Sequence, residues 1–359
     1  MTLRFFARVA ACFVVLGASS AVHAESATDV SPICTTVFDE AGPRTLLSRG
    51  SYCFRSNVME HVSSNPERTA ETRADVEAYM YSDNALNQLS WDIKLRFRTK
   101  PVAGEWVPLQ VKPYIDCAGL CTVSAAPTID LMPGGLTSEA TITLTPTMAG
   151  ANPMTFQPTI EYRIVRTGES FEDGQSISRF HANAYVPKIR CDEGLARRGT
   201  KGCVYIEAPA IFSGISMSDP DVDESAIHIR EAQAAGLPGK FVERGDGSIL
   251  QDSSNDNPLT RTREPDVIAK NRSAARKQYV LQYAEEPVCT LTTDPDDPPG
   301  PCNCDEYPFA STREGASRAS FSVKRIDALD NQRAGARLGN FFTSQRVIDG
   351  DTFYVNITD

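Results

Sequence analysis

Apolar residues alternate with polar ones in many short runs between residues 45 and 186, and this period of two is the strongest constraint on the fold. Successive side chains of a β-strand point to opposite faces, so such runs are typical of half-buried antiparallel strands. The clearest runs are Trp91-Ile93-Leu95-Phe97, Ala140-Ile142-Leu144 and Ile160-Tyr162-Ile164. Turn-forming clusters at 100–104 and 132–135 separate the runs at intervals suited to a sandwich. We therefore expect an all-β, immunoglobulin-like sandwich in residues 25–187.

One stretch within that half has a different pattern. Ala70, Val76 and Tyr79 roughly follow a helical spacing, and Asp and Glu are frequent around them. The spacing predicts a helix over residues 68–81.

The remaining residues, 188–359, have the character of a second unit, and 359 residues exceed the usual size of one domain. Acidic residues at 221–224 and glycines at 236 and 239 frame a short helix between them. Further on, the order is a strand at 321–326, Asp330 as a helix cap, a helix at 331–339 and a closing strand at 353–357. This mixture predicts an α+β domain.

The first 24 residues have the pattern of a secretory signal peptide. Arg4 and Arg8 precede an apolar run, and Val22 and Ala24 have the spacing of a cleavage site. Cys12 is a poor lipidation site because the apolar run continues past it. No later run reaches the roughly 18 apolar residues that span a bilayer. We expect a secreted or periplasmic protein with no membrane partner.

Export makes disulfides the expected state of the nine cysteines that follow residue 24. Three local pairs are predicted: Cys34 with Cys53, Cys117 with Cys121, and Cys191 with Cys203. Cys289 pairs with either Cys302 or Cys304, which leaves an odd thiol. A zinc site is the weaker alternative, because the chain has four histidines and the Cys302-Asn303-Cys304 spacing lacks the two-residue gap of common zinc knuckles.

The charge balance limits how the chain can bind nucleic acid. A net charge of −10 argues against packaging of nucleic acid over a broad cationic surface. It leaves room for a nuclease with a local basic groove. The sequence has no phosphate-binding loop with a following Lys, and no Gly-x-Ser-x-Gly elbow.

Three carboxylates cluster in the segment from Cys304 to Gly315, namely Asp305, Glu306 and Glu314. Hydrolysis of a phosphodiester requires a base that activates water and a cation that offsets charge on the phosphate, and carboxylates serve both needs. From composition alone, the plainer alternative is a surface loop that happens to be acidic.

The segment resembles the NucA/NucB deoxyribonuclease family, in which an Asp-Glu-aromatic-Pro stretch is followed closely by Glu-Gly. The matching residues here are Asp305, Glu306, Tyr307, Pro308, Glu314 and Gly315. The helix beginning Asp330-Asn331 and the segment His228-Ile229-Arg230 also resemble family features, so the resemblance covers about residues 187–359. One departure is Ala316, where the family often has a second glycine.

The resemblance implies a nuclease domain with a ββα-metal-like core and a divalent ion, magnesium or manganese. It makes Asp305 the base, and it allows Glu306 to lie in either the inner or the outer coordination shell of the ion. Glu314 would bind the ion or polarise water, and Asn331 would be a second ligand. His228 would contact phosphate or stabilise the leaving group, although a helix-packing role is equally compatible with its sequence. The cations expected to bind substrate phosphates are Arg230, Arg272 and Arg333.

The sequence therefore predicts a secreted, metal-assisted deoxyribonuclease that cuts DNA internally with little sequence preference. Two other functions stay open. One is an exported binding or adhesion protein whose nuclease-like half is inactive. The other is a secreted nuclease toxin, for which an immunity protein is the expected partner.

Overall fold

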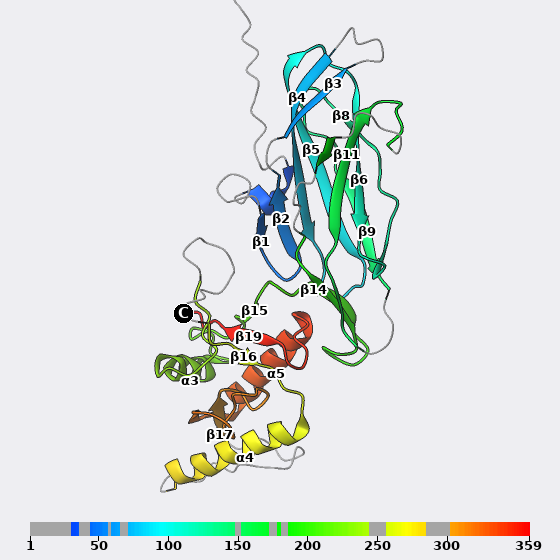
Figure 1. The fold of residues 1–359 in the computed structure, drawn as a ribbon. Helices are drawn as coiled ribbons and strands as arrows, with labels where there is room; N and C mark the ends of the chain where they lie inside the picture. Colours follow the sequence, from blue (N-terminus) through cyan, green and yellow to red (C-terminus); the bar gives the residue numbers. More distant parts are fainter. Residues whose placement is uncertain are drawn as a thin grey trace, which may run out of the picture.

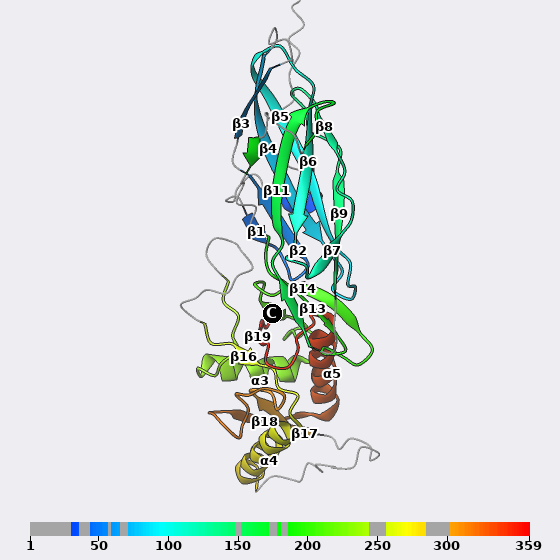
Figure 2. The same ribbon diagram turned by 45° about the vertical axis from the view of Figure 1, so that its right-hand side comes forward.

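The computed structural model describes residues 30–35, 44–56, 59–64, 71–147, 152–171, 178–180, 186–243, 256–284 and 302–359. The signal peptide predicted at residues 1–24 lies outside them. Within this part of the chain the fold is mostly β-sheet with three α-helices. Figures 1 and 2 show an elongated β-rich part above and a smaller carboxy-terminal part below, which contains all three helices.

Two antiparallel sheets form most of the β-rich part. The larger has the order β1-β2-β4-β5-β9-β7, with β3 also paired to β4, and the smaller has the order β12-β11-β6-β8. The strands of the larger sheet are β1 (Arg44–Leu46), β2 (Ser51–Arg55), β3 (Met59–Ser64), β4 (Glu71–Asp83), β5 (Trp91–Gly104), β7 (Cys121–Val123) and β9 (Ala140–Pro146). Those of the smaller are β6 (Leu109–Asp116), β8 (Ile129–Leu131), β11 (Thr159–Arg166) and β12 (Ser178–Phe180).

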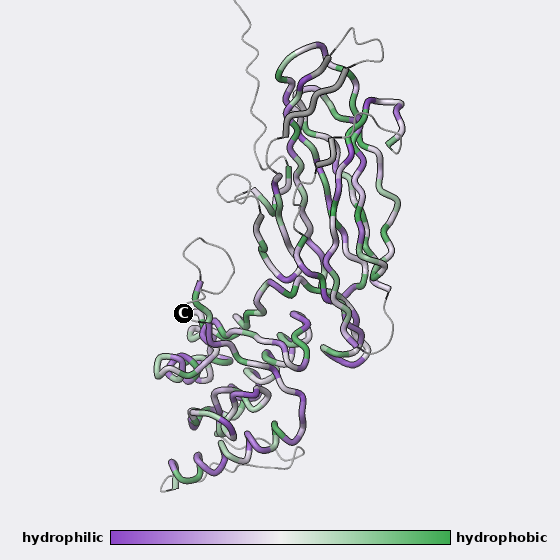
Figure 3. The backbone as a smooth tube through the Cα atoms, viewed as in Figure 1, coloured by the Kyte–Doolittle hydropathy of each residue, from purple (hydrophilic) through white to green (hydrophobic). Residues whose placement is uncertain are grey.

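The predicted alternation is visible in the burial of these strands. In β5, Trp91, Ile93, Leu95 and Phe97 are buried, while the residues between them are half-exposed. Figure 3 shows hydrophobic and hydrophilic residues alternating along the strands. Both sheets contribute to one hydrophobic core, so each sheet covers the apolar face of the other.

The helix predicted over residues 68–81 is wrong, because β4 occupies residues 71–83. β4 pairs with β2 and β3 on one side and with β5 on the other, so its backbone groups are satisfied by the sheet ladder. Ala74, Val76, Ala78 and Met80 are all buried, in the period of a strand. Hydrogen-bonded pairing with three neighbouring strands outweighed the local helical spacing.

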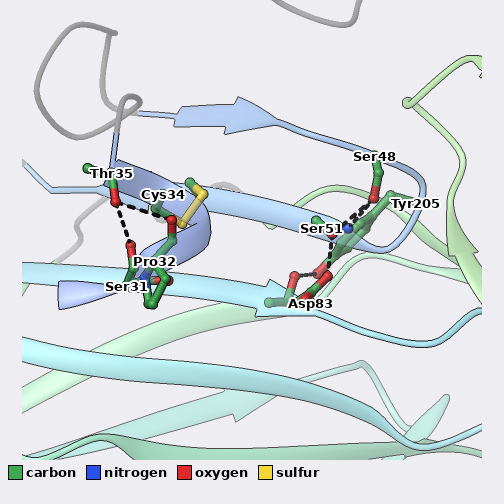
Figure 4. Close-up of a disulfide and its surroundings, with 10 residues drawn as sticks. Ser31, Pro32, Cys34, Thr35, Ser48, Ser51, Asp83 and Tyr205 are labelled. Carbon is green, nitrogen blue, oxygen red and sulfur yellow. Dashed lines mark hydrogen bonds between the residues drawn. A yellow bond between two sulfur atoms is a disulfide. The ribbon is translucent and has the colours of Figure 1, made fainter. Parts of the chain in front are cut away.

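The three predicted disulfides are confirmed: Cys34–Cys53, Cys117–Cys121 and Cys191–Cys203. Figure 4 shows the first, where the short helix η1 (Pro32–Cys34) is tied to β2. Cys302 is also disulfide-bonded, whereas Cys304 is a free thiol. Cys289, the predicted partner of one of them, lies outside the described residues.

A third antiparallel sheet lies at the base of the β-rich part, with the order β10-β13-β14. Its strands are β10 (Met154–Phe156), β13 (Ile189–Glu193) and β14 (Lys201–Tyr205). Tyr205 packs edge-on against Trp91, with ring centroids 4.9 Å apart. Ala208 still belongs to this first core, whereas Ala210 belongs to a second one. Core membership therefore changes beyond the predicted boundary at residues 187/188.

The carboxy-terminal part contains a small sheet, a hairpin and the three helices. In the sheet, β19 (Thr352–Val355) pairs in parallel with β15 (Ala210–Phe212) and antiparallel with β16 (Leu259–Thr260). The hairpin consists of β17 (Cys302–Tyr307) and β18 (Ser322–Asp327). The helices are α3 (Asp223–Ala234), α4 (Pro265–Gln282) and α5 (Ala328–Ser344). None of the described helices has the length and hydropathy to cross a membrane.

Buried charged groups join the two parts. Arg346, just after α5, makes a two-pronged ion pair with Asp192 of β13, with nitrogen–oxygen distances of 2.5 and 2.9 Å. Both side chains are almost fully buried. Arg49 and Arg190 donate to the carbonyls of Gln345 and Arg346, each over 2.7 Å. The β-rich part thus satisfies carbonyl groups that the end of α5 leaves unpaired.

Candidate active site

A cavity of about 450 Å³ lies where the three helices meet β17. Each element supplies part of its wall, and the set includes charged, amide, hydroxyl and apolar groups. The lining residues are Ser225, Ile229, Arg272, Arg276, Asn303, Cys304, Asp305, Glu306, Phe309, Ala310, Ser311, Asn331, Ala334, Gly335 and Leu338. Asp305 and Glu306 are the carboxylates of this set.

Asp305 is held by a buried histidine on a different element. Its Oδ2 lies 2.6 Å from Nδ1 of His228 on α3, and Nε2 of that ring lies 2.9 Å from Oγ of Ser322 on β18. An ionised carboxylate only accepts hydrogen bonds, so the proton is on Nδ1, and this N–H donates a hydrogen bond to Asp305. His228 is 1% exposed and does not line the cavity. This position fixes the Asp305 carboxylate and keeps the imidazole away from the cavity.

Glu306 is next to Asp305 on β17 but lies in a different environment. Burial raises its pKa to about 7, and the negative charge of Asp305 adds to this shift. Arg272 and a hydrogen bond from the Ala310 backbone N–H act in the opposite direction. The cavity therefore holds two neighbouring carboxyl groups whose charge is only partly offset.

Helix α5 follows β18 directly and brings Asn331 to the cavity. The helix is capped by Asp327, whose carboxylate accepts from the backbone N–H groups of Leu329 and Asp330. Nδ2 of Asn331 donates to the Cys304 carbonyl over 3.2 Å, which ties the first turn of α5 to β17. This contact orients the amide beside the two carboxylates.

The predicted capping role of Asp330 is wrong, because Asp327 caps α5. The Asp330 carboxylate instead accepts from the backbone N–H groups of Glu224 and Ser225, over 2.9 and 3.1 Å, and from the Ser225 hydroxyl. It thereby satisfies donors at the start of α3, and its burial raises its pKa. The two helices that flank the cavity are joined at their amino-terminal ends.

The loop after β17 is held by Asn271, a fully buried residue of α4. Its Nδ2 donates to the carbonyls of Ala310 and Thr312, each over 2.9 Å, and its Oδ1 accepts from the Ser317 backbone N–H. A Cβ at Gly315 would lie 2.3 Å from Asn271 Nδ2, so this close approach requires glycine. The Glu-Gly pair is therefore part of a packed loop.

Glu314 does not line the cavity. Its Oε2 accepts from the backbone N–H of Thr260 over 2.8 Å, and the Arg313 N–H donates to the Thr260 carbonyl over 2.9 Å. The structure thus brings Asp305, Glu306 and Asn331 together, with His228 behind them, and uses Glu314 to attach the loop to β16. Its position gives no support to the predicted role of metal ligand.

The three predicted substrate-binding arginines lie in different surroundings. Arg272 lines the cavity. Arg230 on α3 lies 3.8 Å from a carboxylate oxygen of Asp359, and Arg333 on α5 lies 2.7 Å from one of Asp221; neither arginine lines the cavity.

Arg276, which was not selected from the sequence as a site residue, lines the cavity one turn after Arg272. Residues four apart lie on the same side of a helix, so the α4 backbone brings both arginines to the cavity. Ser225, Asn303 and Ser311 also line the cavity without any indication in the sequence.

The cavity suits a hard divalent cation better than a soft one. Its oxygen donors include the carboxylates of Asp305 and Glu306 and the amide of Asn331, which are ligands that magnesium takes together with water. Burial, together with the charge of Asp305, raises the pKa of Glu306, and a bound cation would favour its ionised form. Among the described residues, no three or more His, Cys, Asp or Glu side chains form a metal-binding group.

Residues 250–356 match the sequence model of the family described as deoxyribonuclease NucA/NucB. The matched range includes α4, β17, β18, α5 and β19, and every residue that lines the cavity lies within it except Ser225 and Ile229. It begins later than the resemblance at residues 187–359 suggested, so α3 with His228 and Arg230 lies outside it. A search of curated proteins and a search of solved structures gave no match.

Proposed function

Because residues 250–356 match the NucA/NucB deoxyribonuclease family, we propose that this protein is a secreted, metal-assisted endonuclease that hydrolyses DNA with little sequence preference. The observation that carries the proposal is the cavity at β17, where Asp305 and Glu306 lie together with Asn331 and Arg272. Secretion is supported by the disulfides of the β-rich part, which are typical of oxidising compartments.

The proposed architecture has two domains after a signal peptide at residues 1–24. The first, predicted at 25–187, is an immunoglobulin-like sandwich, and its two facing sheets with one shared core support this. The second, predicted at 188–359, has a ββα-metal-like core formed by β17, β18 and α5. The support is the direct succession of these elements and the contact of α5 with both strands.

Asp305 acts as the general base in this proposal. It orients a water molecule toward the phosphorus and accepts its proton, which a carboxylate held in one position does most effectively. His228 donates to Oδ2 over 2.6 Å and so leaves the other oxygen, Oδ1, to the water. The histidine is a positioning residue, because it is buried behind Asp305 and does not reach the cavity.

Glu306 and Asn331 would hold the divalent ion, with magnesium or manganese as the expected species. When bound, such an ion stabilises the charge that develops on the phosphate and on the leaving oxygen. Glu306 supplies a carboxylate oxygen and Asn331 an amide oxygen, and the Cys304 carbonyl keeps the Asn331 side chain in place.

In this proposal Glu314 supports the structure of the loop and does not bind the ion. By accepting from Thr260, it fixes the loop that carries Ala310 and Ser311 into the cavity wall. Among the predicted substrate-binding arginines, Arg272 is retained, because it lies in the cavity and its guanidinium suits a phosphate. Contacts to phosphate carry no base information, which accounts for the expected lack of sequence preference.

The direct test is relaxation of a supercoiled plasmid by the purified mature chain, with EDTA, magnesium or manganese. The proposal predicts cutting with at least one of the ions, none in EDTA, and similar rates on two linear DNAs of unrelated sequence. No cutting under any ion would refute the proposal and favour the exported binding protein instead.

A further inference from the structure

The cations around the cavity fall into two groups, according to whether carboxylates already neutralise them. On the α5 side, Arg333 pairs with Asp221 over 2.7 Å, and Arg337 pairs with Asp219 over 2.6 Å. On the α3 side, Arg230 lies 3.8 Å from Asp359. These arginines are engaged, so a phosphate would have to compete with a carboxylate for each of them.

Helix α4 forms the opposite wall and has a different charge pattern. Arg272 and Arg276 are exposed and line the cavity that contains Asp305 and Glu306. Among the described residues, no carboxylate is within ion-pair distance of either guanidinium. Arg272 lowers the pKa of Glu306 through its charge without forming an ion pair with it, so the N–H donors of both arginines are available to an anionic ligand at the cavity.

The arginine and lysine side chains of α4 lie in two rows along the helix. Asn271, Ala275 and Tyr279 form the buried face of the helix. At about 100° per residue, Arg272 and Arg276 follow that face on one side, whereas Lys270 and Lys277 lie on the other. Four residues of helix rise about 6 Å, so the two arginines are placed to contact successive phosphates of one strand.

We propose that Arg272 and Arg276 form a phosphate track, along which the backbone of one DNA strand lies as its scissile bond enters the cavity. The track rests on the proposed function and goes beyond it by naming the surface that binds the substrate. Each guanidinium donates a pair of N–H hydrogen bonds to one phosphate, as lysine cannot. In this proposal the phosphates are bound by Arg272 and Arg276, and no longer by Arg230 and Arg333.

The salt dependence of binding measures the track directly, because each phosphate contact to duplex DNA steepens the slope of log K against log salt by about 0.9. Binding of a fluorescent 20-base-pair duplex is measured by anisotropy in EDTA, where the DNA is not cut. The Arg272→Gln/Arg276→Gln variant is expected to lose about 1.8 from the slope. Two duplexes of unrelated sequence are expected to give the same result.

The Lys270→Gln/Lys277→Gln variant is the matched control, since it removes the same net charge from the same helix. It is expected to keep the wild-type slope, and unfolding midpoints of both variants verify their folding. The track would be overturned by any of three results. These are equal losses of slope in the two variants, an unchanged slope in the arginine variant, and no binding of the duplex by the wild type. A wild type that binds through the arginines but cuts no plasmid with any ion would refute the proposed function alone.

Discussion

The residue with the clearest assigned role is His228, whose imidazole joins Asp305 to Ser322 across three elements. Sequence reasoning gave it a contact with phosphate or a packing role. Its burial behind Asp305 supports a third role, in which it holds the base. A side chain of this kind affects catalysis through the orientation of its partner, so its loss should alter turnover more than substrate binding.

Replacement of His228 by Ala is expected to lower kcat ten- to a hundredfold, the range typical of partners that orient a catalytic group. KM should stay near the wild-type value, because His228 does not line the cavity. His228→Asn, whose amide can donate from near the Nδ1 position, should recover part of the loss. Plasmid nicking at several DNA concentrations separates the two constants, and a large rise in KM with unchanged kcat would contradict the role.

Glu306 provides a prediction for stability. Its pKa in the folded protein is raised from 4.5 to about 7, so the folded state binds this proton more tightly than the unfolded chain. The associated stabilisation is fully present below about pH 4.5 and is lost as the pH rises through about 7.

Because Glu306→Gln does not titrate, its free energy of unfolding should exceed that of the wild type at pH 8 by roughly 1–3 kcal/mol. The excess should shrink toward pH 5. Urea unfolding in EDTA at pH 5, 6, 7 and 8 measures it, and an excess that is constant across this range would show that Glu306 does not titrate as the structure indicates.

At the scale of elements, the sequence predicted the parts whose structure depends on local pattern. The alternating strands of the β-rich part and the strand-helix succession of β18 and α5 followed from periodicity. The strand β4 was missed because its stability comes from pairing with other strands, which the spacing of its own residues does not show. Asp330 was assigned to the start of α5, but its carboxylate binds the start of α3. The sequence could not show this, because the two segments are more than 100 positions apart.

The same distinction explains the partial success with the site. Adjacent carboxylates on β17 were identified from their motif, and at the cavity they meet two further predicted residues, Asn331 and Arg272. Glu314 is near them in sequence, yet the loop packing around Asn271 directs it to Thr260. Arg276 came into the site through the position of α4 in the fold, which no local pattern specifies.

The loop packing predicts opposite effects for two glycine substitutions. Gly315→Ala places a Cβ 2.3 Å from Asn271 Nδ2, so we expect a loss of about 1–3 kcal/mol in the free energy of unfolding. Gly339→Ala lies in α5 with open space around it and should gain up to about 1 kcal/mol, the helix preference of alanine. Thermal and urea unfolding of both variants test this, and a neutral Gly315→Ala would refute the tight packing.

At the scale of the whole molecule, the β-rich part and the carboxy-terminal part are joined by buried charge. Arg49 and Arg190 bind the carbonyls at the end of α5, the helix that brings Asn331 to the cavity. Burial and the neighbouring Arg190 lower the pKa of Arg49 to about 10. The sequence could not reveal this junction, because its members are separated by 150 or more positions.

Loss of one charged partner should lower the free energy of unfolding far more in a buried ion pair than in an exposed one. Asp192→Asn weakens the two-pronged contact with Arg346, where both side chains are at most 1% exposed, and should cost about 3–5 kcal/mol. Asp221→Asn makes the same change in the exposed pair with Arg333 and should cost less than about 1 kcal/mol. Equal costs in urea unfolding would show that the junction contributes little.

We propose that hydrolysis occurs at the cavity built on β17, with Asp305 as the base and Glu314 outside the reacting centre. The most direct test compares plasmid nicking by Asp305→Asn and Glu314→Gln in magnesium or manganese, after both variants are shown to fold. We predict a loss of at least a hundredfold for Asp305→Asn, the usual cost of a lost general base, and less than tenfold for Glu314→Gln. Near-normal cutting by Asp305→Asn, with activity abolished in Glu314→Gln, would contradict the assignment of the site.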